Sequence, residues 1–302
     1  MVQQMLVGLD GSPLAETILP YVTVLAKGVG AEVTLLHVVH VPEEVQEGER
    51  YQIVQPLLQQ VDTQAQDYLG RVAQQLADAG LAVKSQVITG DTAAAIVGYA
   101  QQKGMDLVAL ATHGRSGLQR WFHGSVAEKV LHTTQMPLLL IRPTEEQTPS
   151  APELTQIVIP LDGSPAAEAA LPLAEELAAS CKVPLILLQV VETVVLSFAD
   201  PAGMGLSSYP QVLEGLQEAA DIYVQRLAAT VSSKGFSVHT ETPMGTPAEK
   251  IVEYVHDHRG SLVVMTSHGR TGLAGLVLGS VARRVVQHGN TPTLVVRPPV
   301  IS

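Results

Sequence analysis

The sequence predicts an α/β protein made of two similar domains, each a five-stranded parallel sheet with helices on both faces. The first observation is an internal repeat: residues 6–13 read LVGLDGSP and residues 158–165 read VIPLDGSP. The second is that short apolar runs alternate with helical patterns in each half, which requires crossovers between parallel strands. The third is a polar, proline-rich segment between the halves. We therefore expect domains at residues 1–143 and 155–302, joined by a linker at 144–154.

The size and composition indicate a folded protein and disfavour polyanions as binding partners. The chain has 302 residues, 46% of them hydrophobic, and a formal net charge of −11. This negative charge disfavours nucleic acid and anionic lipid as partners, and no apolar run reaches the roughly 18 residues of a membrane span. A single cysteine, Cys181, is too few for an intrachain disulfide or a cysteine zinc cluster. The first residues lack the layout of a secretory signal, so we expect a cytoplasmic protein.

The elements of the first half can be placed in order. Strands are expected near residues 4–9, 32–39, 82–88, 106–111 and 137–141. Ser12 and Ser164 are suited to cap the first helix of each half, with Pro13 and Pro165 at the first helical position. Further helices are expected over residues 92–102 and 247–257. The repeat spacing grows by about three residues after the second strand of the second half, and we place this gain in an irregular loop at 199–205.

A glycine-rich segment follows the fourth strand of each half. Residues 111–125 read ATHGRSGLQRWFHGS, and residues 266–280 read TSHGRTGLAGLVLGS. Each copy follows an apolar run, at 107–110 and 262–265, and precedes a helical pattern, at 126–132 and 281–288. A strand, a glycine loop and a helix start aim backbone N–H groups and the positive end of a helix dipole at one spot. The segment therefore predicts an anion site, and a phosphate is the expected anion.

Three kinds of residue in these segments suit a phosphate. Glycines let a ligand approach the backbone, serines add a hydroxyl at the helix start, and arginines offer forked donors. These candidates are Gly114, Arg115, Gly124 and Ser125 in the first copy, and Gly269, Arg270, Gly279 and Ser280 in the second. Two alternatives stay open: Ser125 and Glu128 also fit a capping box that needs no ligand, and Arg120 could cover a surface or an interface. We expect His113 and His268 to brace the loops rather than to catalyse.

A carboxylate ends the first strand of each half. Asp10 and Asp162 precede the capped helix, so they could simply help to cap it. The alternative is a contact with a nucleotide or its magnesium, because Mg²⁺ takes one or two carboxylates together with phosphate oxygens. Valines at the end of the second strand could form an apolar wall for a flat base or belong to the core: Val38 and Val190, or their neighbours Val39 and Val191.

Both halves resemble the universal stress protein family, and the resemblance covers nearly the whole chain. The shared features are the LDGS start, the LLHVV second strand at 35–39, the THGRSGL and GSVA parts of the loop, and the closing proline-strand-arginine segments at 137–142 and 292–297. The resemblance implies a Rossmann-like, adenine nucleotide alpha hydrolase-like fold in each half. ATP-binding members carry a signature of glycine, two residues, glycine, nine residues, glycine, then serine or threonine. Ala111 and Thr266 replace the first glycine here. The bulk of Thr266, together with the additional Arg120 in the first loop, leads us to expect the first site to bind more tightly.

The same resemblance implies ATP, or another adenine nucleotide, as the ligand, with Mg²⁺ accompanying it. The implied contacts are Asp10, Val38, Ala111, Gly114, Arg115, Gly124, Ser125 and Val126 in the first half, and Asp162, Val190, Thr266, Gly269, Arg270, Gly279, Ser280 and Val281 in the second. Asp10 and Asp162 would reach the metal through the magnesium nucleotide. The family also pairs domains through the last strand, so residues 138–141 would lie against 293–296. We expect a pseudo-dimer within one chain, which could pair again as a homodimer.

Three functions remain open from the sequence. The first is an ATP-binding stress-response regulator whose bound state matters more than turnover. The second is a slow ATPase that uses Asp10 or Asp162 with Mg²⁺, and the third is a scaffold that binds no nucleotide. The sequence shows no nucleophile elbow, no hydrolytic triad and no Walker loop ending in Gly-Lys-Ser/Thr. We therefore expect a binding protein rather than an enzyme.

Overall fold

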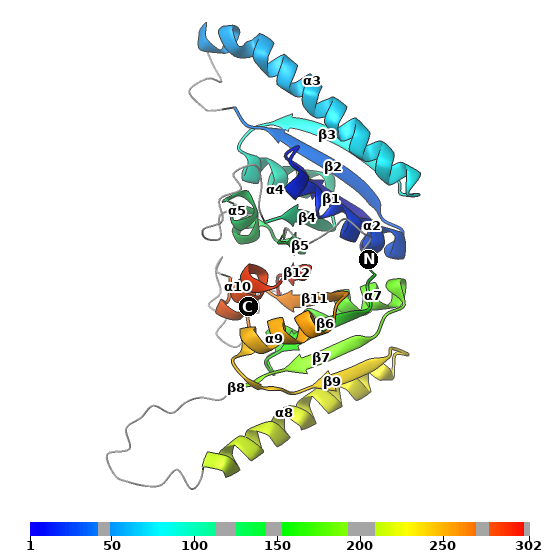
Figure 1. The fold of residues 1–302 in the computed structure, drawn as a ribbon, viewed down its shortest axis with the longest axis vertical. Helices are drawn as coiled ribbons and strands as arrows, with labels where there is room; N and C mark the ends of the chain where they lie inside the picture. The colour runs from blue at the N-terminus through cyan, green and yellow to red at the C-terminus, as the bar shows by residue number, and fades with distance from the viewer. Residues whose placement is uncertain (42–48, 113–124, 143–152, 193–208, 270–277, 299–302) are drawn as a thin grey trace, which may run out of the picture.

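The computed structural model describes residues 1–41, 49–112, 125–142, 153–192, 209–269 and 278–298 (Figure 1). The first half contributes five strands: β1 (Gln4–Gly8), β2 (Glu32–Val39), β3 (Val83–Thr89), β4 (Leu107–Ala111) and β5 (Leu138–Ile141). The second half contributes β6 (Gln156–Leu161), β7 (Leu185–Gln189), β8 (Val191–Glu192), β9 (Val238–Glu241), β10 (Met244–Gly245), β11 (Ser261–Thr266) and β12 (Thr293–Val296). The expected strand positions of the first half are confirmed to within one or two residues.

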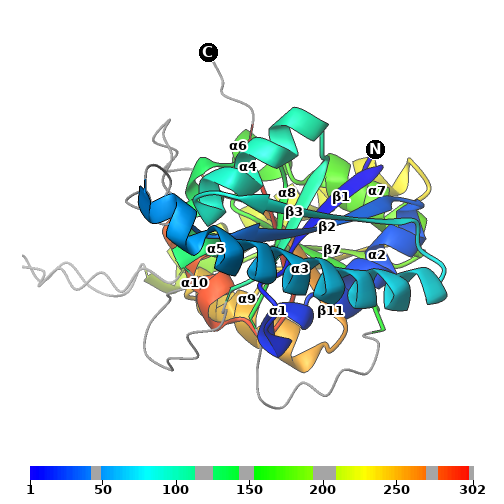
Figure 2. The same ribbon diagram turned by 90° about the horizontal axis from the view of Figure 1, so that it is seen from above.

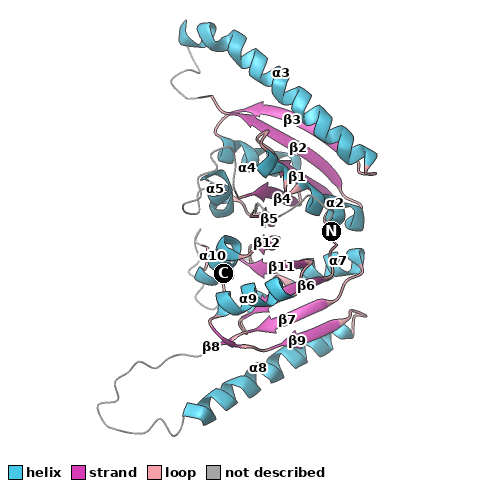
Figure 3. Ribbon diagram, in the orientation of Figure 1, coloured by secondary structure: helices cyan, strands magenta, loops and turns pink. Residues whose placement is uncertain are grey.

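Ten of these strands form one sheet that runs through both halves. Its order is β3-β2-β1-β4-β5-β12-β11-β6-β7-β9, and the strand labels of Figure 3 follow this order from β3 at the top to β9 at the bottom. Pairs within each half are parallel, whereas β5 and β12 pair antiparallel at the seam. Leu294 lies directly opposite Leu139 there. The expected pseudo-dimer through the last strands is confirmed.

Helices cover both faces of the sheet. They are α1 (Pro13–Glu16), α2 (Leu19–Val29), α3 (Glu49–Asp78), α4 (Thr92–Lys103) and α5 (Ser125–Thr133) in the first half, and α6 (Pro165–Glu168), α7 (Leu171–Cys181), α8 (Tyr209–Ser232), α9 (Pro247–Asp257) and α10 (Ser280–His288) in the second. The apolar sides of α2, α3, α7 and α8 pack on one face, and those of α4, α5, α9 and α10 pack on the other. Figure 2 shows the helices packed around the strands. The fold class predicted from the alternating pattern is confirmed.

The first helix of each half is split in two, which the sequence pattern did not predict. Proline lies in the first turn of the second piece, at Pro20 in α2 and Pro172 in α7. A proline ring has no N–H to donate and clashes with the preceding turn, so one helix ends and another begins there. The predicted caps are confirmed, because Ser12 and Ser164 accept the backbone N–H of Ala15 and Ala167, at 3.2 Å each.

A small parallel pair, β8 with β10, forms in the second half only. Its pairing of Val191 with Met244 matches the pairing of Val39 with Thr89 at the end of the β2–β3 ladder. The second-half ladder is interrupted just before this point, where Pro243 stands between β9 and β10 and lacks a backbone donor. The pair is therefore the broken end of a longer ladder.

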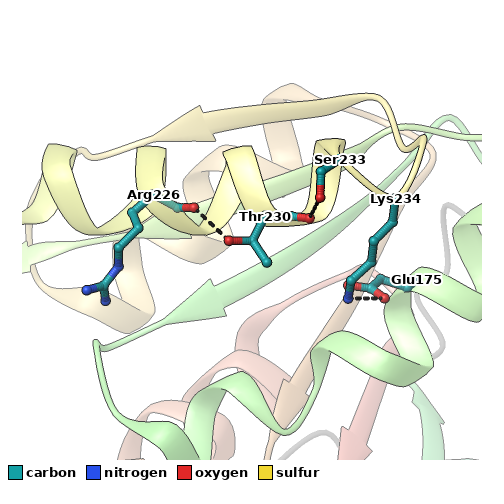
Figure 4. Close-up of polar contacts among 5 residues, drawn as sticks. All are labelled: Glu175, Arg226, Thr230, Ser233 and Lys234. Carbon is teal, nitrogen blue, oxygen red and sulfur yellow. Dashed lines mark hydrogen bonds and ion pairs between the residues drawn. The ribbon is translucent and has the colours of Figure 1, made fainter.

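The long helix of the second half is tied to the body of the fold at its carboxyl end. Lys234 follows α8 and contacts both carboxylate oxygens of Glu175 on α7, at 2.8 and 2.9 Å (Figure 4). Glu175 is mostly buried while Lys234 is half exposed, so the pair adds at most about 1 kcal/mol. In the described part of the chain, no helix combines the length and apolar character that a membrane crossing requires.

Candidate functional site

The candidate site of each half lies where the sheet order reverses. In the first half the chain moves from β1 outward to β2 and β3, then returns to the other side of β1 with β4 and β5. Crevices at such a switch point, beyond the carboxyl ends of the strands, are where open α/β sheets bind ligands. Asp10 follows β1 and Ala111 ends its neighbour β4, while Val38 lies near the end of β2 on the other side. The fold thus gathers these three predicted site residues at one edge.

The aspartate of each half braces the capped loop beside it. Oδ1 of Asp10 accepts the backbone N–H of Ser12 at 2.9 Å and its hydroxyl at 2.6 Å. Asp162 accepts the same two bonds from Ser164, at 3.0 and 2.6 Å. The interpretation of local capping is therefore confirmed for one carboxylate oxygen in each half. These bonds do not bear on whether the aspartates also contact a ligand; that hypothesis depends on the position of the carboxylates.

Gly269 brings the second glycine loop against Asp162. A methyl group placed on Gly269 would lie 2.0 Å from Oδ2 of Asp162, well inside van der Waals contact. A side chain of any size is therefore excluded at this position while the carboxylate keeps its place. The close approach joins the loop after β11 to the aspartate after β6, which is the convergence that the motifs predict.

Gly269→Ala should lower the free energy of unfolding by about 2 kcal/mol, because the new methyl forces Asp162 off its bonds to Ser164. Urea unfolding of purified protein measures the loss. In an Asp162→Ala background the same substitution should cost much less, because the opposing oxygen is gone. An equal loss in both backgrounds would contradict the contact.

The base of the second loop is closed by backbone bonds. Gly279 donates to the carbonyl of Ser267 at 2.8 Å, and Ser267 donates to the carbonyl of Val296 in β12 at 2.8 Å. In the first half Thr112 makes the matching bond to Ile141, also at 2.8 Å. Ser267 is fully buried, and sequence reasoning missed this anchoring role. The only hint was a small polar residue at the same place in both copies.

Side chains at the base serve the loop itself. Thr266 donates its hydroxyl to the carbonyl of His268 at 2.7 Å, and Nδ1 of His268 lies 2.8 Å from the hydroxyl of Ser267. Burial, and then the positive charge of Arg297, lower the pKa of His268, so its ring is neutral near pH 7. The expectation that His268 braces the loop is confirmed, whereas His113 lies outside the described residues.

The helix after the loop begins one residue earlier than the capping-box interpretation requires. Arg283 donates to the carbonyl of Gly279 at 2.9 Å, so Gly279 is the N-cap of α10 and Ser280 is the first helical residue. Helix α5 likewise begins at Ser125 rather than Val126. A capping box with Ser125 as the cap is therefore wrong, and Glu128 instead lies 4.0 Å from Nε2 of His132. At α10 the cap residue is a glycine, so among the described residues no side chain caps the first turn, whose amides have no acceptor within the helix.

The four valines considered from the sequence differ in how deeply they are buried. Val38 and Val190 are half-buried and pack against the cluster beneath α4, α5, α9 and α10. Their neighbours Val39 and Val191 are 7% and 5% exposed, so they belong to the core. Val126 and Val281, in the first turns of α5 and α10, pack in the same cluster as Val38 and Val190. Of the two valine pairs proposed from the sequence, only Val38 and Val190 leave surface for a ligand.

A tyrosine near the second aspartate adds to the bracing and was also missed from the sequence. The hydroxyl of Tyr223 donates to Oε1 of Glu168 at 2.9 Å. Burial raises the pKa of Tyr223, with smaller contributions from the charges of Glu168 and Asp162. The tyrosine therefore stays protonated and holds α8 to the end of α6.

Several predicted residues cannot be placed. Gly114, Arg115, Gly124 and Arg270, together with Arg120, lie outside the described residues. Among the residues that are described, no group of three or more His, Cys, Asp or Glu side chains could hold a metal. A magnesium ion that arrives on a nucleotide needs only one or two carboxylates, so Asp10 and Asp162 remain suited to it.

A surface hollow at the opposite edge of the sheet does not suit an anion. It has a volume of about 380 Å³ and lies at the amino ends of the strands, where Met1, Glu32 and Glu176 help to line it. Glu176 accepts the backbone N–H of Val2 at 2.5 Å and faces the terminal amine. Two carboxylates in its wall oppose a phosphate, so the carboxyl edge remains the candidate site.

Comparisons with known proteins agree with this architecture. The sequence model described as the universal stress protein family matches residues 1–142 and again 153–297. Universal stress protein Rv1996 of Mycobacterium tuberculosis is 27% identical over 318 residues, covering 97% of this chain and 94% of its own. Universal stress protein MJ0531 of Methanocaldococcus jannaschii is 33% identical over 144 residues, 48% of this chain and 82% of its own. A crystal structure of a universal stress protein from Archaeoglobus fulgidus shares the fold, with a TM-score of 0.72 at 19% identity, covering 98% of this chain and 99% of its own.

Proposed function

The chain belongs to the universal stress protein family, and on that premise we propose that each half binds an adenine nucleotide, with ATP as the ligand. The site is then a regulatory binding site in the stress response, where the bound state matters more than turnover. We also propose that the two domains span 1–143 and 155–302, with the linker at 144–154.

The observation that carries the proposal is a helix start capped by glycine, with a carboxylate held against the glycine loop of the same half. Gly279 caps α10 without a side chain, and Gly269 lies against Asp162 with no room for a Cβ. Phosphates bind where helix N–H groups are unpaired and the backbone is bare. The main-chain amides of Ser280 and Val281 would face the phosphates at this point.

The remaining contacts are assigned by the repeat and the motif. In the second half Asp162 and Val190 would contact the nucleoside, and Thr266 would lie against the ribose. In the first half the corresponding residues are Asp10, Val38 and Ala111, followed by Ser125 and Val126 at the helix start. The signature assigns Gly114 and Gly124 to the phosphates, and Arg115 and Arg270 are assigned to them because a guanidinium offers forked donors. Mg²⁺ would supply positive charge between the phosphates and the aspartates.

Isothermal titration calorimetry with ATP and Mg²⁺ tests the proposal. We expect saturable binding of ATP and much weaker binding of adenosine, because the helix start contributes only when phosphates are present. Mass spectrometry of the purified protein should also detect a retained adenine nucleotide. A protein that carries no nucleotide and gives no heat on titration would contradict the proposal and favour a scaffold. Phosphate release over hours would instead favour a slow ATPase.

A further inference from the structure

Two arginines cross the seam between the halves. Nη1 of Arg142 donates to the carbonyl of Gln287 at 2.6 Å, and Nη2 of Arg297 donates to the carbonyl of Leu131. Each arginine directly follows the last strand of its own half, and each acceptor lies in a helix of the other half. The two bonds occupy nearly matching positions in the repeat, so they form a reciprocal pair.

The acceptors lie at the carboxyl ends of their helices. Gln287 is in the last turn of α10 and Leu131 is in the last turn of α5. Carbonyls there have no partner within the helix and carry the negative end of its dipole, so a guanidinium is a favourable donor. Both arginines are part-buried at these bonds, which makes a charge-assisted hydrogen bond stronger than it is in water.

The helices held in this way are those that start at the candidate phosphate sites. Ser125 begins α5 and Ser280 begins α10, and each helix is only nine residues long. Such a helix is rigid over roughly 14 Å, so a bond at its carboxyl end fixes the direction of its amino end. Figures 1 and 2 both show α5 and α10 next to each other across the seam.

Arg297 also lies near the second glycine loop. The carbonyl of Val296, the residue before Arg297, accepts the backbone N–H of Ser267 at 2.8 Å. After burial, the charge of Arg297 is the smaller cause of the lowered pKa of His268. His268 contacts Ser267, whose carbonyl holds Gly279 at the start of α10. Arg297 thus directly follows the strand that holds the base of the second loop, while its guanidinium bonds the helix of the first half.

We propose that Arg142 and Arg297 are positioning residues exchanged between the halves, so that the affinity of each phosphate site depends on an arginine from the other half. The inference rests on the proposed function. Its consequence is that each site should weaken when the arginine of the other half is removed.

The test uses the full-length chain with one phosphate site removed at a time. Ser125→Glu leaves only the second site, and Ser280→Glu leaves only the first, because a carboxylate at the helix start repels a phosphate. Arg142→Met is then added to each background, and ATP affinity is measured by calorimetry. We expect a loss of at least about fivefold in the Ser125→Glu background, where α10 carries the remaining site, and less than about twofold in the Ser280→Glu background.

The matched control is Arg284→Met, which removes an exposed arginine from α10 and should change affinity in neither background. Equal losses from Arg142→Met in both backgrounds, or no loss in either, would overturn the proposal. If Arg142→Met does not fold, Arg142→Lys keeps the charge but loses the guanidinium and should show the same unequal pattern. Absence of ATP binding by the wild-type chain would overturn the proposed function, whereas binding with equal losses overturns only the role of the arginines.

Hydrogen exchange gives a second readout that needs no ligand. Amides at 280–288 should exchange faster in Arg142→Met than in Arg284→Met, while amides at 125–133 should be unchanged. Equal exchange in the two variants at 280–288 would show that Arg142 does not hold α10, and would overturn the proposal as well.

Discussion

Ser280→Glu is expected to abolish ATP binding in the second half, and Ser125→Glu to abolish it in the first. Both serines are exposed and are the first residues of their helices, so a carboxylate there lies where the phosphates would bind. Two like charges about 4 Å apart repel by roughly 4 kcal/mol near a protein surface. Affinity at the altered site should therefore fall by at least about 100-fold, as measured by calorimetry with magnesium ATP.

Folding should not suffer from either change, since an acidic residue in the first turn favours the helix dipole. The matched controls Ser125→Ala and Ser280→Ala keep the backbone amides and should lose only a hydroxyl contact, or about tenfold in affinity. Full affinity in a chain that carries both glutamates would show that the nucleotide binds elsewhere.

The same pair of variants ranks the two sites. Thr266 stands where the first half has Ala111, and its hydroxyl is bonded to the carbonyl of His268, so its β-branched side chain is fixed at the loop base. We therefore expect Ser125→Glu to remove the tighter binding event and Ser280→Glu the weaker one. The reverse order would mean that bulk at this position does not limit affinity.

Features of the fold set by nearby residues could be predicted from the sequence. The strand bounds followed from short apolar runs, and the caps at Ser12 and Ser164 followed from a serine before proline. The pairing of the last strands followed from the family resemblance. Its register, with Leu294 opposite Leu139, depends on how two halves pack and has no sequence pattern of its own.

Features that depend on backbone contacts between segments far apart in the sequence could not be predicted. The interruption at Pro243 depends on a ladder bond that a proline cannot donate, which matters only once the partner strand is known. The start of α5 was placed one residue late because Ser125 to Glu128 fits a capping box, whereas in the second half a glycine takes the cap position. Arg142 and Arg297 are the last residues of the proline-strand-arginine segments that the sequence analysis identified. Their bonds could not be predicted, because the acceptors are backbone carbonyls, which any residue type supplies.

The sequence predicted which residues of the candidate site lie near one another, but not the hydrogen bonds that they make. Asp162 and Gly269 do meet, because both follow neighbouring strands at the switch point. The bonds from Ser164 to Oδ1 of Asp162 fit the alternative of local capping. The anchor at Ser267 was missed because a buried serine in a glycine loop looks like any loop residue.

Leu139→Glu should unfold the chain or lower its free energy of unfolding by about 4 kcal/mol or more. Leu139 is fully buried in β5 and faces Leu294 across the seam. A carboxylate there has no partner and loses its hydration, which costs about 3 to 5 kcal/mol even when the structure relaxes around it. Chemical unfolding followed by circular dichroism measures the loss.

The matched control is Leu57→Glu, because Leu57 lies on α3 with 60% of its surface exposed. The same substitution there should change stability by less than about 0.5 kcal/mol. Opening the seam would also bare the edges of β5 and β12, and unpaired edges recruit other strands. We therefore expect Leu139→Glu, but not Leu57→Glu, to associate with rising concentration in analytical ultracentrifugation. A monomeric Leu139→Glu protein of wild-type stability would show that β5 and β12 do not hold the halves together.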